Sequence, residues 1–155
     1  MGFFKKFGIN AETRLMDSTK FQGQKYDRVL VDAPCSGEGV TVVYDEKLRR
    51  DVSGFDNVVQ YSQEDVERFS ELQGKLLQSG FDHLKKSGIL NYATCTLNKI
   101  ENESVIHEFL QRNGDASVVN SNIDKYGIKH KVSNLGVRIL PGKTKGFYFT
   151  KIIRR

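Results

Sequence analysis

Residues 29–39 read VLVDAPCSGEG, a short apolar run that passes directly into an acid and a thiol. The apolar part predicts a buried strand, so Asp32 and Cys35 would follow at or just beyond its carboxyl end. The pattern recurs at residues 89–95, ILNYATC, where a second apolar run leads into Cys95. The chain has no other cysteines. Because ligands of open parallel sheets bind at the carboxyl ends of the strands, both thiols are candidates for one common site.

Strands and helices alternate around these two motifs. Ser62 has the character of an N-cap, and Asn98 with Glu101 resembles a capping box at the start of a second helix. The expected strands are 12–18 (ending at Asp17), 26–33, 89–95, 116–120 and 146–153, and the expected helices are 62–86 and 98–112, with a long loop at 40–61. This order predicts an α/β fold with a largely parallel sheet, in which residues 26–33 are buried on both faces. The final strand is expected to lie antiparallel to residues 116–120.

The chain has 155 residues, enough for one domain with a sizeable core, and a formal net charge of +5. The excess of Lys and Arg over Asp and Glu, 24 to 19, favours a polyanionic partner such as nucleic acid. The candidate phosphate contacts, each of which could equally be a solvated surface charge, are Arg49, Arg50, Arg138, Lys143 and Lys145. The sequence shows no secretory segment and no apolar stretch of membrane-spanning length, which predicts an intracellular, cytoplasmic protein. Its cysteines are then expected to be reduced thiols.

Other chemistries fit the sequence less well. Neither cysteine has a histidine at zinc-ligand spacing, so no metal site is expected. The glycines of residues 37–39 lack the third glycine of a dinucleotide-binding loop. A cysteine-dependent hydrolase would need a histidine beside Cys95, whereas His83, His107 and His130 all fall on expected helices or loops. That class stays open as an alternative.

Two motifs together carry a resemblance. DAPCSGEG (32–39) followed by ATCTLNKIENE (93–103) resembles the paired signature of the RsmB/Nop/Sun family of RNA cytosine-5 methyltransferases. The intervening ELQGKLL (71–77) contains a glutamine as family members do, and RILPGKTKGFYFTKI (138–152) resembles the family's closing hairpin. The resemblance covers essentially the whole chain. It implies a Rossmann-like methyltransferase sheet and S-adenosylmethionine as the cofactor.

The resemblance also implies a role for each motif residue. Cys95 is the nucleophile that adds to C6 of cytosine, since a thiolate is reactive even as a minor species near neutral pH. Cys35 is assigned to release of the product, and Asp32 to protonation of the base at N3. Asp17 matches the residue that hydrogen-bonds the adenine of the cofactor, and Asp32 and Pro34 complete the cofactor-binding group. The implied substrate is tRNA or rRNA, with its cytosine flipped or already single-stranded.

One part of the family pattern is not found in this sequence. Family members place two further strands, one of them glycine-rich, ahead of the segment that opens this chain. Residues 1–155 are therefore expected to form a single, partial methyltransferase catalytic domain, incomplete at its N-terminal side because strands 1 and 2 are missing. Such a domain would need the missing N-terminal segment or a second chain as a partner. The alternative is a catalytically inactive fragment or paralogue that binds RNA or a partner protein.

Overall fold

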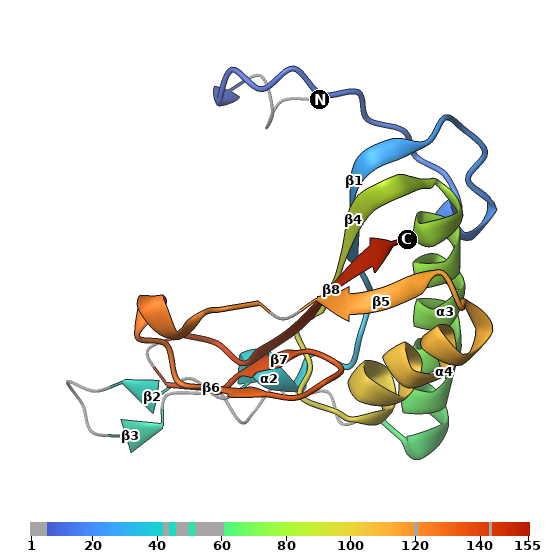
Figure 1. Cartoon of the computed structure of the whole chain (residues 1–155). Helices are drawn as coiled ribbons and strands as arrows, with labels where there is room; N and C mark the ends of the chain where they lie inside the picture. The colour runs from blue at the N-terminus through green and yellow to red at the C-terminus, as the bar shows by residue number, and fades with distance from the viewer. Residues whose placement is uncertain (1–5, 42–43, 46–49, 52–60, 120, 143) are drawn as a thin grey trace.

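The structure, a computed structural model, describes residues 6–41, 44–45, 50–51, 61–119, 121–142 and 144–155. Strands β1 (Tyr26–Asp32), β4 (Leu84–Thr94) and β8 (Phe147–Arg154) stand side by side in one open sheet. Helices α3 (Gln63–Asp82) and α4 (Val105–Arg112) lie together on one side of it (Figure 1). The fold is therefore mixed α/β, with a Rossmann-like layer of helices over the sheet.

The sheet is less parallel than the sequence predicted. Its described strands follow the order β1-β4-β8-β7-β6, where β6 is His130–Val132, β7 is Val137–Ile139, and β5 (Ala116–Val119) also pairs with β8. Only the β1–β4 pair among them is parallel, and the other pairs are antiparallel. The prediction of a largely parallel sheet is thus wrong, because the strands after β5 are joined by short hairpin turns instead of the long crossovers that parallel pairing requires. The predicted antiparallel neighbours β5 and β8 are confirmed.

The strand predicted at residues 12–18 is not formed. Asp17 instead caps the short 3-10 helix η1 (Ser18–Lys20), and its carboxylate accepts a hydrogen bond from the Thr19 amide at 3.0 Å. The neighbouring Leu15 is fully exposed. An extended segment is stable only where another strand takes up its N–H and C=O groups, and the described part of the chain supplies none here.

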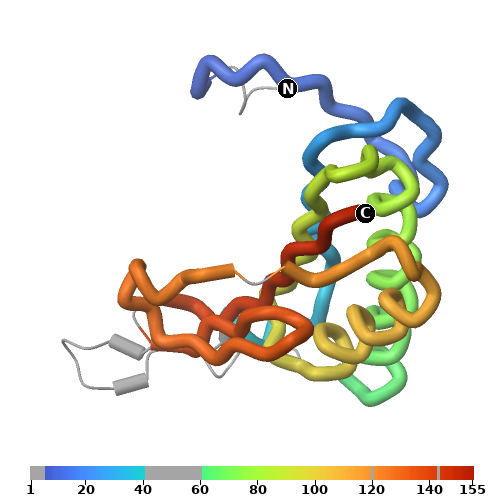
Figure 2. The backbone as a smooth tube through the Cα atoms, in the orientation of Figure 1, coloured from blue at the N-terminus to red at the C-terminus, as the bar shows by residue number. Residues whose placement is uncertain are grey.

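For the same reason β1 is an edge strand. Leu30 is 69% exposed, so the predicted burial of residues 26–33 on both faces is wrong. One face of β1 packs on α3, through Val29 and Val31, while the outer edge has no described neighbour. Figure 2 shows the described N-terminal segment leaving this edge and running away from the sheet.

Helix α3 begins as predicted and ends early. The Ser62 side chain accepts from the Asp65 amide, and Asp65 returns the bond in a capping box. The helix stops at Asp82, four residues before the predicted end. A tertiary contact meets this end of the helix: the Arg154 guanidinium donates to the carbonyl of Phe81, in the last turn of α3, at 3.0 Å, and to that of Leu84, the first residue of β4, at 3.2 Å. The Phe81 carbonyl is thereby satisfied without another helical turn.

The core lies between the two helices and the centre of the sheet. The predicted inner stripe of the second helix is confirmed, with Val105, Ile106 and Phe109 buried. Phe109 packs edge-on against Phe81, with ring centroids 5.1 Å apart. The other fully buried apolar side chains are Leu77, Leu84, Leu90, Tyr92, Tyr148 and Ile152.

The second helix does not begin with the predicted capping box. Its first turn is a π-helix, η3 (Ile100–Ser104), in which Glu101 is fully buried and faces the protein interior. The Asn98 side-chain oxygen accepts from the Ile100 amide at 2.9 Å, and the Asn98 amide donates to the Thr96 hydroxyl. The Glu101 carboxylate binds Ser36 and Gln73 instead of the Asn98 amide, so the prediction of a capping box is wrong.

Two other regions need only brief description. Most of the loop predicted at 40–61 lies outside the described residues, which show a short helix α2 (Glu38–Thr41) and a ribbon of β2 (Tyr44–Asp45) and β3 (Arg50–Asp51). Within the described ranges, no helix combines the length and the apolar character needed to cross a membrane.

Candidate active site at the carboxyl ends of β1 and β4

The structure brings the two cysteines into contact. β1 and β4 run parallel, and their ladder continues for one bond beyond Asp32, from the Ala33 amide to the Ala93 carbonyl at 3.1 Å. Each chain then turns, and the Sγ atoms of Cys35 and Cys95 lie 3.2 Å apart. Both are free, half-buried thiols. The distance is that of a close hydrogen bond and exceeds the S–S bond length of about 2.05 Å.

The environment of Cys35 favours its protonated form. Burial, and after it the hydrogen bond with Cys95, raises the pKa of Cys35 to about 12. Near neutral pH this side chain is therefore a thiol that can donate a hydrogen bond to the neighbouring sulfur. Once deprotonated, it would be a strong base, because basicity rises with pKa.

A buried polar layer lies directly behind the thiols. The Glu101 carboxylate accepts from the Ser36 amide at 2.9 Å and from the Ser36 hydroxyl at 2.5 Å. The Ser36 and Thr96 hydroxyls, one residue beyond each cysteine, are 2.9 Å apart. Sequence reasoning did not assign these residues to the site. The signal that could have found them is the position of Ser36 and Thr96 immediately after the two cysteines.

Gly39 lets the two loops approach each other. Its amide donates to the Cys95 carbonyl at 2.9 Å, and its carbonyl accepts from the Gly146 amide at 2.7 Å. A Cβ atom at Gly39 would lie 2.4 Å from the Gly146 oxygen and 2.8 Å from the Cys95 oxygen. Gly39 therefore serves close backbone packing, a role different from that of a glycine in a dinucleotide-binding loop, which the sequence had excluded.

A cavity of about 360 Å³ opens at the free edge of β1, between β1, η1 and α3. Asp32 and Pro34, two of the three predicted cofactor residues, line it together with Ser18 and Leu30. Asp32 is exposed at the end of β1. Asp17, the third predicted residue, precedes Ser18, and hydrogen bonds from the hydroxyl and amide of Thr19 lower its pKa, so it is a carboxylate near neutral pH.

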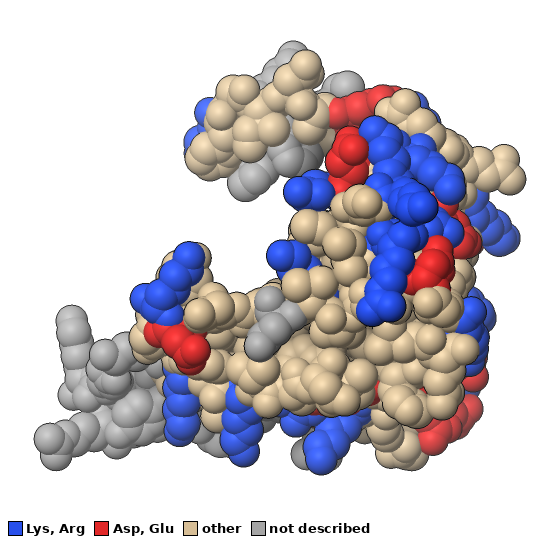
Figure 3. Space-filling view, viewed as in Figure 1, with Lys and Arg blue, Asp and Glu red and all other residues tan. Residues whose placement is uncertain are grey.

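The predicted phosphate contacts are dispersed. Arg138, on β7, forms an ion pair with the half-buried Glu103 and holds η3 against the hairpin. Lys145 is exposed and precedes Gly146, which contacts Gly39. Arg49 and Lys143 lie outside the described residues, as does the side chain of Arg50. Figure 3 shows many Lys and Arg side chains where β1 and β4 begin, the end of the sheet opposite the thiols.

Histidines are placed away from the thiols. The His83 carbonyl binds the Tyr26 amide at the start of β1, and His130 lies 3.1 Å from Asp124 on the β6 side of the molecule. His107 is exposed on α4. Within the described part of the chain, no histidine is hydrogen-bonded to either cysteine, and no group of three or more His, Cys, Asp or Glu could hold a metal ion.

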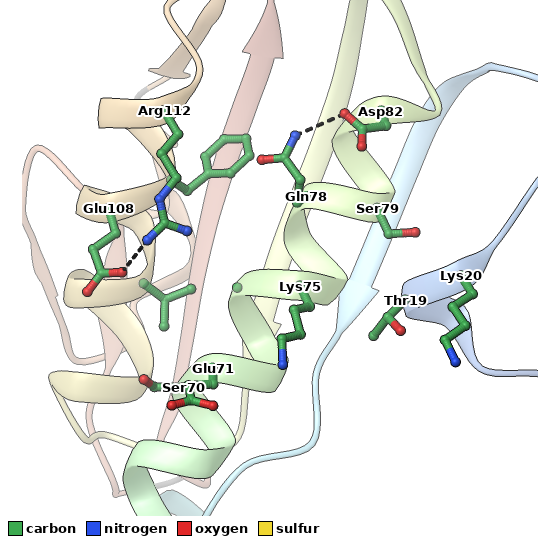
Figure 4. A pocket seen from close by; sticks show the side chains of 13 residues that line it. Thr19, Lys20, Ser70, Glu71, Lys75, Gln78, Ser79, Asp82, Glu108 and Arg112 are labelled. Atoms are coloured by element: carbon green, nitrogen blue, oxygen red, sulfur yellow. Dashed lines mark hydrogen bonds and ion pairs between the residues drawn. The ribbon is translucent and has the colours of Figure 1, made fainter.

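A second hollow, of about 900 Å³, lies between η1, α3 and α4 and contains neither cysteine. Most of its lining side chains are polar or charged, and Figure 4 shows Glu108 paired with Arg112 and Gln78 hydrogen-bonded to Asp82. It is a surface groove separate from the thiol site.

Comparisons with known proteins identify relatives of this chain. Residues 4–153 match the family model described as 16S rRNA methyltransferase RsmB/F. Ribosomal RNA small subunit methyltransferase B of Yersinia enterocolitica is 35% identical over 136 residues, which are 85% of this chain and 27% of that protein. Ribosomal RNA small subunit methyltransferase F of Shewanella amazonensis is 39% identical over 111 residues, 66% of this chain and 22% of that protein.

A solved structure shares the fold. NSun6 from Pyrococcus horikoshii, crystallised with SFG, superposes with a TM-score of 0.74 over 97% of this chain and 36% of its own length, at 24% identity. The chain thus spans about a quarter of the two curated relatives and about a third of this structure.

Proposed function

Because this chain belongs to the RsmB/F family of 16S rRNA methyltransferases, we propose that it carries the two-thiol part of a site that transfers a methyl group from S-adenosylmethionine to C5 of cytosine in RNA. The contact between the Cys35 and Cys95 sulfurs, 3.2 Å, is the observation that carries the proposal. Residues 1–155 would form one partial catalytic domain. The activity itself would belong to the longer protein that the relatives represent.

The thiols divide the covalent chemistry between them. The Cys95 sulfur adds to C6 of cytosine, which makes C5 electron-rich, while Asp32 supplies a proton at N3. Bound S-adenosylmethionine supplies the electrophilic methyl group. Release then requires that the N3 proton return to Asp32, that C5 lose its proton to a base and that the S–C6 bond break, with the electron pair of that bond returning to Cys95. Cys35, a thiol near neutral pH and in contact with the departing sulfur, is proposed to assist this release by donating a hydrogen bond to it.

The cofactor is proposed to bind in the cavity at the free edge of β1. Asp32 and Pro34 line this cavity and lead directly into Cys35, so a bound methyl donor would lie close to the thiols. Asp17, a carboxylate held by Thr19, is the proposed acceptor of a hydrogen bond from an adenine amino group. The SFG bound by NSun6 is an analogue of S-adenosylmethionine, which supports the same cofactor here.

The proposed substrate is ribosomal RNA, with tRNA as the other class. Both relatives are named as ribosomal RNA methyltransferases, which favours rRNA. Lys145 is the proposed phosphate contact nearest the thiols, because the next residue, Gly146, touches the loop that binds Cys95. Arg49, Arg50, Arg138 and Lys143 remain further candidates. Partners of the free β1 edge would be a missing N-terminal segment or a second chain.

The exposed edge of β1 favours a second candidate function. An open edge beside the proposed cofactor cavity leaves Asp32 in solvent and one wall of the cavity unformed within this chain. Residues 1–155 alone would then bind RNA or a partner protein without catalysis.

Cofactor binding and adduct trapping decide between the two. Calorimetry of the 155-residue chain with S-adenosylhomocysteine should show micromolar binding, about −8 kcal/mol, if the chain builds the site by itself. The full reaction is tested with labelled cofactor and small-subunit rRNA, where Cys95→Ala should abolish transfer and Cys35→Ala should accumulate a covalent protein–RNA adduct. Normal turnover by Cys35→Ala would refute the division of roles. Absent cofactor binding by a folded chain, with RNA affinity retained, would favour the non-catalytic function.

A further inference from the structure

Two buried side chains that bond each other, Glu101 and Gln73, hold the peptide groups on both sides of Cys35. The Glu101 carboxylate accepts from the Ser36 amide, which follows Cys35, at 2.9 Å. The same carboxylate accepts from Gln73 at 2.9 Å, and the Gln73 amide group also donates to the Pro34 carbonyl, which precedes Cys35, at 2.8 Å. Glu101 and Gln73 are both fully buried. Hydrogen bonds to buried side chains therefore fix the turn that carries Cys35 at the residue before the thiol and at the residue after it.

The side chain of the next residue, Asn102, is hydrogen-bonded to both neighbours of Cys95. The Asn102 oxygen accepts from the Thr94 hydroxyl at 2.6 Å, and the Asn102 amide group donates to the Thr96 carbonyl at 3.1 Å. Thr94 and Thr96 are the two neighbours of Cys95, and like Asn102 they are fully buried. Buried polar groups that are hydrogen-bonded, as Glu101 and Asn102 are, are costly to displace and specify one local arrangement.

The π-turn places both side chains in the interior. The Ser104 amide bonds the Lys99 carbonyl five residues back, at 3.0 Å, as a π-helix requires. Within it Glu101 and Asn102 are adjacent and both have no exposed surface. The buried Tyr92 hydroxyl donates to the Glu101 carbonyl at 2.8 Å and ties this turn to β4. Single π-turns inside α-helices often occur at functional sites.

We propose that the adjacent residues Glu101 and Asn102 are positioning residues that set the distance between the two thiols, Glu101 through the Cys35 turn and Asn102 through the Cys95 turn. Because both side chains leave the same π-turn, one rigid element fixes both loops, and the Ser36–Thr96 hydrogen bond links the loops to each other. The consequence for catalysis rests on the proposed function. The positioning itself is a property of this chain alone.

Thiol chemistry tests the positioning without cofactor or RNA. Diamide accepts two electrons and two protons as Cys35 and Cys95 join in a disulfide, and the rate depends on how closely the sulfurs approach. Glu101→Gln and Asn102→Asp both keep the size of the side chain. Glu101→Gln replaces one acceptor oxygen with an amide donor, and Asn102→Asp replaces the amide donor with an acceptor oxygen. Each should slow disulfide formation about tenfold or more. The matched controls, Glu108→Gln on the exposed face of α4 and Asn134→Asp in the exposed β6–β7 turn, should oxidise at the rate of the unmodified chain.

A second readout separates positioning from general loosening. Alkylation by iodoacetamide engages one thiol at a time. A positioning defect weakens the hydrogen bond between the thiols and should accelerate alkylation at Cys35 alone, whereas partial unfolding would accelerate it at both cysteines. Disulfide formation at the unmodified rate in Glu101→Gln and Asn102→Asp would overturn the proposal. So would a loss of disulfide rate that appears only together with accelerated alkylation of both cysteines.

Methyl transfer gives the catalytic consequence. In a form of this protein that transfers methyl groups, Glu101→Gln and Asn102→Asp should each lower kcat with little change in the KM for RNA. If the unmodified protein transfers none, the proposed function fails while the disulfide rates still decide the positioning. If transfer and disulfide rates are both unchanged in the variants, the positioning fails and the proposed function stands.

Discussion

The sulfurs of Cys35 and Cys95 lie 3.2 Å apart, although 60 residues separate the two cysteines along the chain. A parallel strand pair, two turns and a buried polar layer are needed to produce that contact. Burial, and after it this contact, raises the pKa of the Cys35 thiol. The predictions below test its chemistry, the packing around it, and the elements that support it.

The first prediction concerns the reactivity of Cys35 with pH. The pKa of Cys35 is raised to about 12, so the thiolate stays a minor species below that pH. Its alkylation rate should rise about tenfold per unit from about pH 7 to about pH 10 without levelling off. Peptide mass spectrometry after iodoacetamide treatment resolves the two cysteines. In Cys95→Ala, where one cause of the raised pKa is gone, the rate should level off at a lower pH. A plateau near the ordinary thiol pKa of about 8.5 in the unmodified protein would contradict this.

The second prediction compares the effects of two glycine substitutions on the free energy of unfolding. Gly39→Ala would place a methyl group 2.4 Å from the Gly146 oxygen, and should destabilise the fold by about 1–3 kcal/mol. Gly74→Ala lies within α3 with no atom within 4 Å of the added methyl, and should stabilise by up to about 1 kcal/mol. Urea unfolding of both variants measures the difference. Equal effects of the same sign would show that the loop carrying Gly39 is free to move away from Cys95.

The third prediction concerns the start of α3. Ser62→Ala removes the side-chain acceptor for the Asp65 amide and should lower the free energy of unfolding by about 1 kcal/mol. Ser62→Asp keeps an acceptor at the same position and should retain most of the stability. Chemical denaturation of the two variants checks the cap, and an equal loss in both would rule it out.

The fourth prediction concerns RNA. Lys145→Ala should weaken binding of single-stranded RNA and reduce the slope of log affinity against log salt by about 0.7, the value for one lost phosphate contact on a single strand. Lys86→Ala serves as the control, since this exposed residue lies near the start of β4, at the opposite end of the sheet from the thiols. Filter binding at several salt concentrations measures both. An identical change in the two variants would indicate only the loss of overall charge.

The sequence alone determined several local features of this protein. Apolar runs that end in a turn predicted β1 and β4, and hence the placement of both cysteines at strand ends. Ser62 and Asn113 marked where α3 begins and α4 ends, because a cap depends on side chains a few residues away. The motifs around the cysteines were also sufficient for the resemblance to the methyltransferase family, which the comparisons bear out.

Only the tertiary structure decided the remaining features. Residues 12–18 contain a strand-like pattern but form none, and β1 is exposed at its edge, because a strand depends on its neighbour for hydrogen bonds. α3 ends where Arg154, 72 residues beyond its last residue, satisfies the Phe81 carbonyl. Glu101 was predicted to complete a capping box with Asn98, whereas the partners of its carboxylate, Ser36 and Gln73, are 65 and 28 residues away. Local patterns report which backbone conformation a segment prefers. Which buried polar groups and strand edges find partners depends on segments far apart in the chain, and that is settled only when the chain folds.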